Sequence, residues 1–315
     1  MNKEFNDIES YRKARRSKQR KRRIVTLSVM VLLCVCLVLV FAHFLNLDLF
    51  GSQESHGGLA SGTRPSQEGF PISLEGDSGR DISSMGGLLA LLTDQKFAVY
   101  SDSGKWIGSD AHGYANPVAK TTSKRALIYD RGGYKFKVID KNSVLHTKTL
   151  TDKIVFADIS EEGYVAVATQ QSRYYASLTV YDSKMQEIYT WNSASTHIVD
   201  MDFYKGSKGC AVLGYSANGG AIASSVISLD FSLEKIKFEK QFDDMLGVSI
   251  AVKNSGNIAV VGDSQMKVID AKGNDVGEYS YSKQLSFSSN SASNYTVLAI
   301  TDPNSRDNSE AVVLD

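Results

Sequence analysis

The hydrophobic positions of this chain follow two different patterns, and the change between them divides it. Residues 24–45, IVTLSVMVLLCVCLVLVFAHFL, are almost continuously apolar, with His43 near the end. At about 1.5 Å per residue, a helix of this length reaches roughly 33 Å, enough to cross a hydrocarbon core of about 30 Å. A buried helix of a globular core would rarely be apolar on every face. The pattern therefore predicts one transmembrane α-helix over residues 24–45.

The pattern after this segment is different. Residues 46–69 lead away from the helix, and most of them are Gly, Ser and other polar residues, which predicts a flexible linker. From residue 70 to residue 315, short runs of alternating apolar and polar residues are separated by Gly, Asn, Asp and Ser, with no long helical period. This alternation predicts an all-β domain over residues 70–315.

A strand that ends in aspartate recurs through the all-β domain. Its copies end at Asp140, Asp182, Asp230, Asp270 and Asp315, and the first copy, FAVYSDSGK, is offset by one residue to Asp102. Successive copies are 38 to 48 residues apart, and a second apolar strand precedes most of them. Four strands in about 40 residues, repeated about six times, predict a β-propeller of about six four-stranded blades. A β-sandwich is the alternative, but it needs no aspartate turn at a regular interval.

The six aspartates have a structural interpretation. One aspartate per blade would spread the carboxylates around a ring, so they could not converge on one ion. Asp readily accepts backbone N–H hydrogen bonds in tight turns. We therefore predict turn-forming roles for these residues and no metal site or cofactor.

Charge predicts the orientation of the chain in the membrane. Residues 1–23 carry ten Lys and Arg against three Asp and Glu, and the rest of the chain carries 25 against 32. Positive charge beside a first transmembrane helix stays on the cytoplasmic side. We expect the protein to reside in the cell membrane. Its tail over residues 1–23 would be cytoplasmic and attract anionic lipids, and its domain over residues 70–315 would be extracellular. A nucleic-acid patch is the alternative interpretation of this tail, and its position beside the helix argues against it.

No catalytic motif is present. The histidines show no metalloprotease spacing, and the chain has neither a G-x-S-x-G elbow nor a phosphate-binding G-x-x-x-x-G-K-S/T loop. Cys210 is the only cysteine beyond the predicted helix, so no disulfide can form within the domain. We predict no catalytic residues and a protein that is not an enzyme.

Tyrosines provide the clearest binding chemistry, because their rigid amphipathic rings suit peptide and glycan surfaces. Tyrosine is also simply a good strand residue. The tyrosines near turns or strand ends are Tyr114, Tyr134, Tyr174, Tyr175, Tyr204 and Tyr215.

The repeats VYSDSGKW, VYDSKMQEIYTW and VIDAKGNDVGEY resemble those of quinoprotein-like propellers. Quinoprotein dehydrogenases carry a tryptophan in nearly every blade, whereas this chain has only Trp106 and Trp191, so the quinone cofactor is not implied. The whole layout more closely resembles an uncharacterised family of single-pass, membrane-anchored, WD40-like propeller proteins of Gram-positive, clostridia-like bacteria. The likeness rests mainly on HGYANPV at 112–118 and ALIYDRGG at 126–133. Because no activity is established for that family, the resemblance implies none for this chain. In and beside these stretches lie the residues that we predict to bind a partner: His112, Tyr114, Asn116, Arg131 and Tyr134.

Together these features predict a non-enzymatic protein-interaction platform on the outside of the cell membrane, with an envelope protein as partner and a role in envelope assembly. A protein that binds or processes cell-wall glycan is the alternative. Propellers present a broad ring of loops, which suits either function.

The ends of the repeat predict how the ring closes. The last copy stops at Asp315 without a following strand, while residues 70–75 precede the likely first strand of the first unit, 81–87. An unpaired edge is usually covered in folded proteins. We therefore expect residues 70–75 to pair with the strand that ends at Asp315.

Overall fold

A computed structural model describes residues 69–74, 76–218, 220–233, 235–290, 295–302 and 305–315. The predicted cytoplasmic tail, transmembrane helix and nearly all of the linker lie outside these residues. No helix among the described residues is long and apolar enough to cross a membrane.

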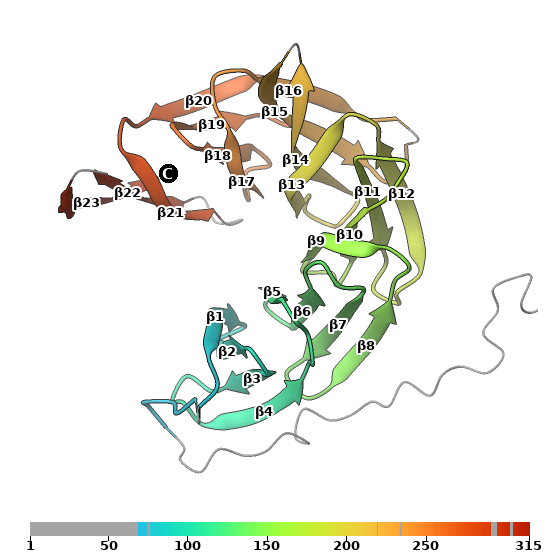
Figure 1. Ribbon diagram of the computed structural model, residues 1–315, viewed down its shortest axis with the longest axis vertical. Helices are drawn as coiled ribbons and strands as arrows, with labels where there is room; N and C mark the ends of the chain where they lie inside the picture. Colours follow the sequence, from blue (N-terminus) through green and yellow to red (C-terminus); the bar gives the residue numbers. More distant parts are fainter. Residues whose placement is uncertain (1–68, 75, 219, 234, 291–294, 303–304) are drawn as a thin grey trace, which may run out of the picture. The chain divides into compact units, whose positions relative to one another are not determined.

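The described chain forms six antiparallel sheets, which we call blades 1 to 6 in chain order (Figure 1). Blade 1 contains β1 (Gly79–Met85), β2 (Leu88–Thr93), β3 (Lys96–Tyr100) and β4 (Trp106–Ala111). Blade 2 contains β5 (Pro117–Thr121), β6 (Arg125–Asp130), β7 (Lys135–Asp140) and β8 (Val144–Thr149). Blade 3 contains β9 (Lys153–Ile159), β10 (Val165–Gln170), β11 (Ala176–Tyr181) and β12 (Glu187–Ser193).

The second half repeats this plan. Blade 4 contains β13 (Thr196–Phe203), β14 (Gly209–Asn218), β15 (Ala221–Asp230) and β16 (Phe238–Phe242). Blade 5 contains β17 (Gly247–Val252), β18 (Ile258–Gly262), β19 (Gln265–Ile269) and β20 (Asp275–Ser280). Blade 6 contains β21 (Gln284–Asn290), β22 (Thr296–Asp302) and β23 (Ser305–Leu314). The fold is a six-bladed β-propeller, as the repeat predicts, with three strands in its last described sheet.

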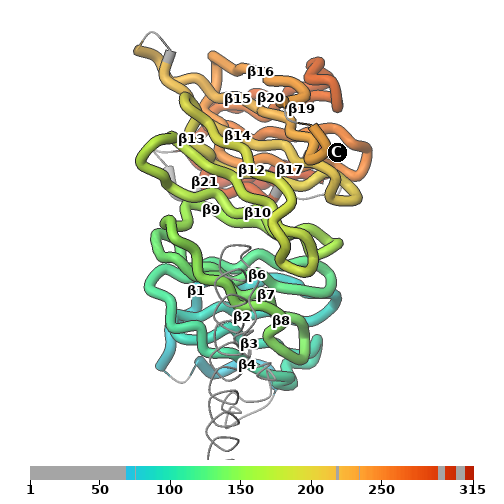
Figure 2. The backbone as a smooth tube through the Cα atoms, turned by 90° about the vertical axis from the view of Figure 1, so that its right-hand side faces the viewer, coloured from blue at the N-terminus to red at the C-terminus, as the bar shows by residue number. Residues whose placement is uncertain are grey.

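In every blade the strands lie side by side in chain order, and the first strand is nearest the centre of the arc (Figure 1). Figure 2 shows blades 1 and 2, in blue and green, below blades 4 and 5, in yellow and orange. Each blade therefore meets the next one in the chain through one face of its sheet.

The core consists of layers between successive blades. Each strand of a middle sheet contributes alternate residues to two layers, as a period of two requires. In β6, for example, Ile128 packs toward blade 1 and Leu127 packs toward blade 3, and both are fully buried. Five such layers join successive blades, and none of the clusters of described residues joins blade 1 to blade 6.

The segment before β1 differs from the prediction. Ile72 and Leu74 pack against Leu91, Ala98 and Tyr100 on the free face of blade 1, and β23 pairs only with β22 among the described strands. The predicted pairing of residues 70–75 with the last strand is therefore wrong in this structure, because the apolar face of blade 1 itself holds the segment.

The first strand also begins earlier than predicted. β1 occupies residues 79–85 rather than 81–87, because Gly86 and Gly87 have φ angles of 59° and 83° and form the turn to β2. A Cβ at Gly86 would lie 2.1 Å from the carbonyl oxygen of Ser123, so this turn requires glycine.

Candidate functional site

Loops leave each sheet at two opposite ends. Because the strands are antiparallel, the turns between second and third strands lie at the same end as the connections from one blade to the next. We call this end the connection face. The turns between first and second strands, and those between third and fourth strands, lie at the opposite end.

The recurring aspartates lie at that opposite end, and most of them bond to their own turns. Asp182 Oδ1 accepts N–H hydrogen bonds from Lys184 and Gln186, both at 2.9 Å. Asp140, Asp230 and Asp270 accept equivalent bonds from residues two positions further on. These bonds hold the turn between the third and fourth strands, which is the role expected for them.

Blade 1 uses a different residue for this turn. The Ser101 hydroxyl accepts N–H hydrogen bonds from Ser103 at 3.3 Å and from Lys105 at 3.1 Å. Ser101, rather than Asp102, therefore occupies the position equivalent to Asp182. At the other end of the chain, Asp315 follows β23, with no described strand after it.

The five predicted partner-binding residues belong to two segments near the connection face, but two of their side chains are buried. His112 and Tyr114 are 6% and 8% exposed, and their rings stack with centroids 5.3 Å apart. The N–H of Tyr114 donates to His112 Nδ1 at 3.0 Å, so Nε2 carries the proton and donates to the carbonyl oxygen of Thr93 at 3.1 Å. Burial lowers the pKa of His112. These two residues pack blade 1 against blade 2 and leave little surface for a partner.

The other three residues are exposed at the connection face. The N–H of Asn116 donates to Asp130 Oδ1 at 2.8 Å, and the N–H of Arg131 donates to the carbonyl oxygen of Asn116 at 2.9 Å. Tyr134 is 43% exposed in the same turn between β6 and β7. Their binding of a partner stays a prediction.

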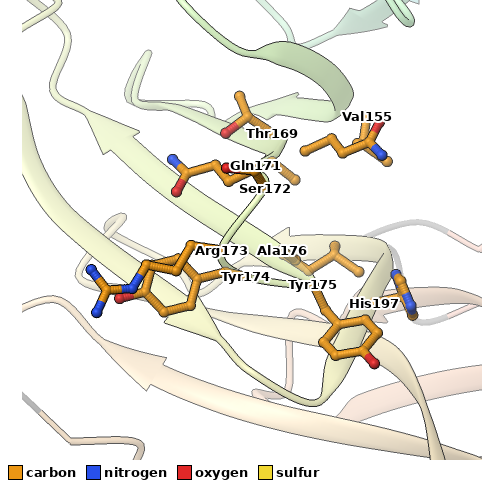
Figure 3. Close-up of a pocket in the computed structure, with 12 residues that line it drawn as sticks. Val155, Thr169, Gln171, Ser172, Arg173, Tyr174, Tyr175, Ala176 and His197 are labelled. Carbon is orange, nitrogen blue, oxygen red and sulfur yellow. The ribbon is translucent and has the colours of Figure 1, made fainter.

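A cavity at the connection face lies one blade further on, around the turn between β10 and β11. Its volume is about 610 Å³. The turn contributes Gln171, Ser172, Arg173, Tyr174 and Tyr175, while Val155 comes from the inner strand of blade 3 and His197 comes from blade 4 (Figure 3). We call it the Arg173 pocket.

Aromatic and cationic groups define the chemistry of the Arg173 pocket. Tyr175 is 56% exposed, and its ring meets that of His197 edge to face at 4.7 Å. The Arg173 guanidinium lies over the Tyr174 ring at 6.0 Å from its centroid. Arg173 is exposed, and it makes no ion pair with a described residue. The described lining contains no Asp or Glu, so the pocket suits a partner with an acidic or aromatic group.

Sequence analysis names Tyr174 and Tyr175 but misses Arg173 and His197. The motif Ser172-Arg173-Tyr174-Tyr175 is a local signal, since it puts a cation and two aromatic rings in one turn. His197 carries no such signal, because only the packing of blade 4 on blade 3 brings it to Tyr175.

A second group of charged residues lies on the inner strands. Lys120 of β5, Asp158 of β9, and Asp200 and Asp202 of β13 are partly buried near one another. Burial opposes the charge on Lys120, yet the three carboxylates raise its pKa. Burial raises the pKa of Asp158 to about 7 and that of Asp202 to about 6.

This group does not resemble a metal centre. Among the described residues, no three or more His, Cys, Asp or Glu side chains are placed to hold a metal ion. Both carboxylates of blade 4 also accept backbone N–H bonds from blade 5, which gives them a structural role.

The family model described as "Family of unknown function (DUF5711)" matches residues 72–315. The chain belongs to the DUF5711 family. This match covers the whole propeller, including the Arg173 pocket. No curated protein matches the DUF5711 chain.

Solved structures show the same fold. The WD40 domain of Neurospora crassa Pan2 has a TM-score of 0.53 and 17% identity, with 75% of this chain and 74% of that chain covered. The β-propeller domain of Myceliophteria thermophila Cps50 (Swd1) has a TM-score of 0.55 and 10% identity, with 75% of this chain and 86% of that chain covered. At these identities the likeness shows the propeller fold of the DUF5711 chain and nothing about its partners.

Proposed function

We propose that this protein is a membrane-anchored, extracytoplasmic propeller that acts as a non-enzymatic platform for binding an envelope protein. The apolar segment 24–45 and the basic residues before it support the anchor and the orientation. The propeller fold, which commonly serves as a protein-interaction scaffold, supports the platform. Envelope assembly is the process that this arrangement suits.

The Arg173 pocket is the observation that carries the proposal. Tyr and Arg are enriched among the residues that dominate binding energy at protein interfaces, because they offer large contact areas with polar ends. Here an exposed tyrosine and an exposed arginine lie in one turn beside a cavity of about 610 Å³. A partner segment with an aromatic or aliphatic side chain for the cavity and a carboxylate for Arg173 fits this arrangement.

Co-purification from native membranes tests the proposal. The full chain should retain a specific envelope protein after mild solubilisation, and the double substitution Arg173→Ala with Tyr175→Ala should reduce that recovery at least tenfold. Val276→Ala is the control, because Val276 is 58% exposed on β20 but lies far along the chain in blade 5. Equal recovery with the double variant and with the wild-type chain would show that the pocket does not bind the partner.

Cell-wall glycan is the alternative ligand. A separate polar cavity in blade 3 favours it.

A further inference from the structure

A second cavity lies on the face of blade 3 that turns toward blade 2. Its volume is about 300 Å³, enough for roughly one sugar ring and a substituent. Twelve residues line it, and apart from Leu150 and Val167 all of them carry a hydroxyl, amide or carboxyl group. We call it the Ser177 cavity.

Strand register explains how these groups converge. On β10, β11 and β12, Thr169 stands opposite Ser177, and Ser177 stands opposite Asn192. In the next row on the same face, Val167 stands opposite Thr179, and Thr179 stands opposite Thr190. The two rows therefore present a grid of five polar side chains and one valine, Val167, across three strands.

The grid is more polar than packing requires. Further along β10, Val165 and Val167 of the same face belong to a buried apolar layer shared with blade 2. Thr169 and Ser177 are only 7% and 1% exposed, and neither hydroxyl forms a hydrogen bond with a described residue. Neither hydroxyl is among the fully buried polar atoms without a partner, so each still reaches the cavity and can pair with a group placed there.

Amide and carboxyl side chains of the lining add further hydrogen-bonding groups to the cavity. The side chains of Gln171 and Asn192 line the cavity without a side-chain hydrogen bond to a described residue, so each can both donate and accept. The two acidic residues of the lining are Asp152 and Glu187. Asp152 accepts a hydrogen bond from the Thr151 hydroxyl, and Glu187 accepts one from the Thr190 hydroxyl. Each carboxylate retains acceptor capacity for further hydroxyl groups.

We propose that the Ser177 cavity binds an N-acetylated amino sugar. The ring hydroxyls would pair with Thr169, Ser177 and Thr179. The acetamido group has one donor, one acceptor and a methyl group, which match the amides of Gln171 and Asn192 and the apolar side chains of Leu150 and Val167. This site is distinct from the proposed protein-binding site, although the two cavities share Thr169 and Gln171 in their linings.

Calorimetric titration of the full chain with an N-acetylglucosamine tetramer tests the proposal. Binding should be measurable, and Thr179→Val or Asn192→Leu should weaken it at least tenfold. Thr179→Val keeps the shape of the side chain, and unchanged thermal unfolding would show that the variant is folded. Thr147→Val, at an exposed position of β8, is the matched control and should bind as tightly as the wild-type chain.

Two results would overturn this site: no binding of the tetramer at millimolar concentration, or equal binding by the wild-type chain and both cavity variants. A glucose tetramer without acetamido groups should bind at least tenfold more weakly, and equal binding would reject the acetamido assignment. Arg173→Ala should leave sugar binding unchanged, so failure here is distinguishable from failure of the protein-binding proposal.

Discussion

Asp202 of β13 accepts a hydrogen bond from the backbone N–H of Val252 of β17, at 2.8 Å, and so joins blade 4 to blade 5. Two residues earlier, Asp200 accepts the N–H of Ile250 at 3.0 Å. β17 is the inner edge of its sheet, where N–H groups have no neighbouring strand. The two carboxylates satisfy this edge with the spacing of alternate strand residues. The edge of one blade is thus completed by side chains of the blade before it.

Removing this link should destabilise the propeller. Asp202→Ala leaves the N–H of Val252 without its acceptor, and we expect the free energy of unfolding to fall by about 1–3 kcal/mol. Urea denaturation measures this change. Asp243→Ala is the control at an exposed carboxylate, and a loss as large as that of Asp202→Ala would contradict the role of the inter-blade bond.

The inner carboxylates also predict a pH dependence. Asp158 has a pKa of about 7, raised by burial, against an ordinary value of 3.8 in the unfolded chain. Between these values the folded state binds more protons than the unfolded state, so the contribution of Asp158 to stability falls as pH rises. The contribution is fully present below pH 4 and is lost as pH rises through about 7.

Replacement of this aspartate provides the measurement. Asp158→Asn cannot titrate, so the difference in unfolding free energy between variant and wild type should shift in favour of the variant from pH 4.5 to pH 8. Lys120, Asp200 and Asp202 face the same group, and they remain in the variant. A difference that stays constant over this range would show that the pKa of Asp158 is not raised.

The turns between third and fourth strands predict different stability effects for equivalent positions in blades 1 and 3. Asp182→Ala removes the acceptor of two backbone N–H groups and should cost about 1 kcal/mol of unfolding free energy. Asp102→Ala should be nearly neutral, since Ser101 fills that place in blade 1, and Ser101→Ala should be the costly change there. Thermal unfolding of the three variants checks the order, and a larger loss from Asp102→Ala than from Ser101→Ala would reject it.

The repeat made the propeller predictable, because an aspartate turn and an alternating strand are local features that recur at a regular interval. The turn-forming role of Ser101 could not be predicted. Asp102 matches the repeat by residue type, but the Ser101 hydroxyl accepts the hydrogen bonds of the turn. The packing of Ile72 and Leu74 could not be predicted either. Their place next to the first unit predicted pairing with the edge of the last strand, but their apolar side chains cover the free face of blade 1 instead.

The candidate site was less predictable than the fold. The tyrosines of the Arg173 pocket were visible in the sequence, whereas His197 reaches Tyr175 only through contact between two blades. His112 and Tyr114 looked like binding residues because both are amphipathic and close to a turn. Their side chains instead bond and stack with each other inside a layer between blades, which no local pattern reveals.

Orientation in the membrane can be tested on intact cells. A peptide tag at residue 1 should be protected from external protease, while the propeller should be digested or labelled from outside. Cys210 is fully buried, and burial raises its thiol pKa, so it should react with an impermeant maleimide only after the domain is unfolded. Cleavage of the tag in intact cells would contradict the orientation.

The most direct test of the partner-binding claim is site-specific photo-crosslinking in native membranes. A photo-reactive residue at position 175, in the Arg173 pocket, should yield one dominant adduct with an envelope protein. The same residue at position 184, in the aspartate turn at the opposite end of blade 3, should not. Arg173→Ala should reduce the adduct at position 175 at least fivefold. Equal adducts at both positions, or an adduct at position 175 that is insensitive to Arg173→Ala, would contradict the account.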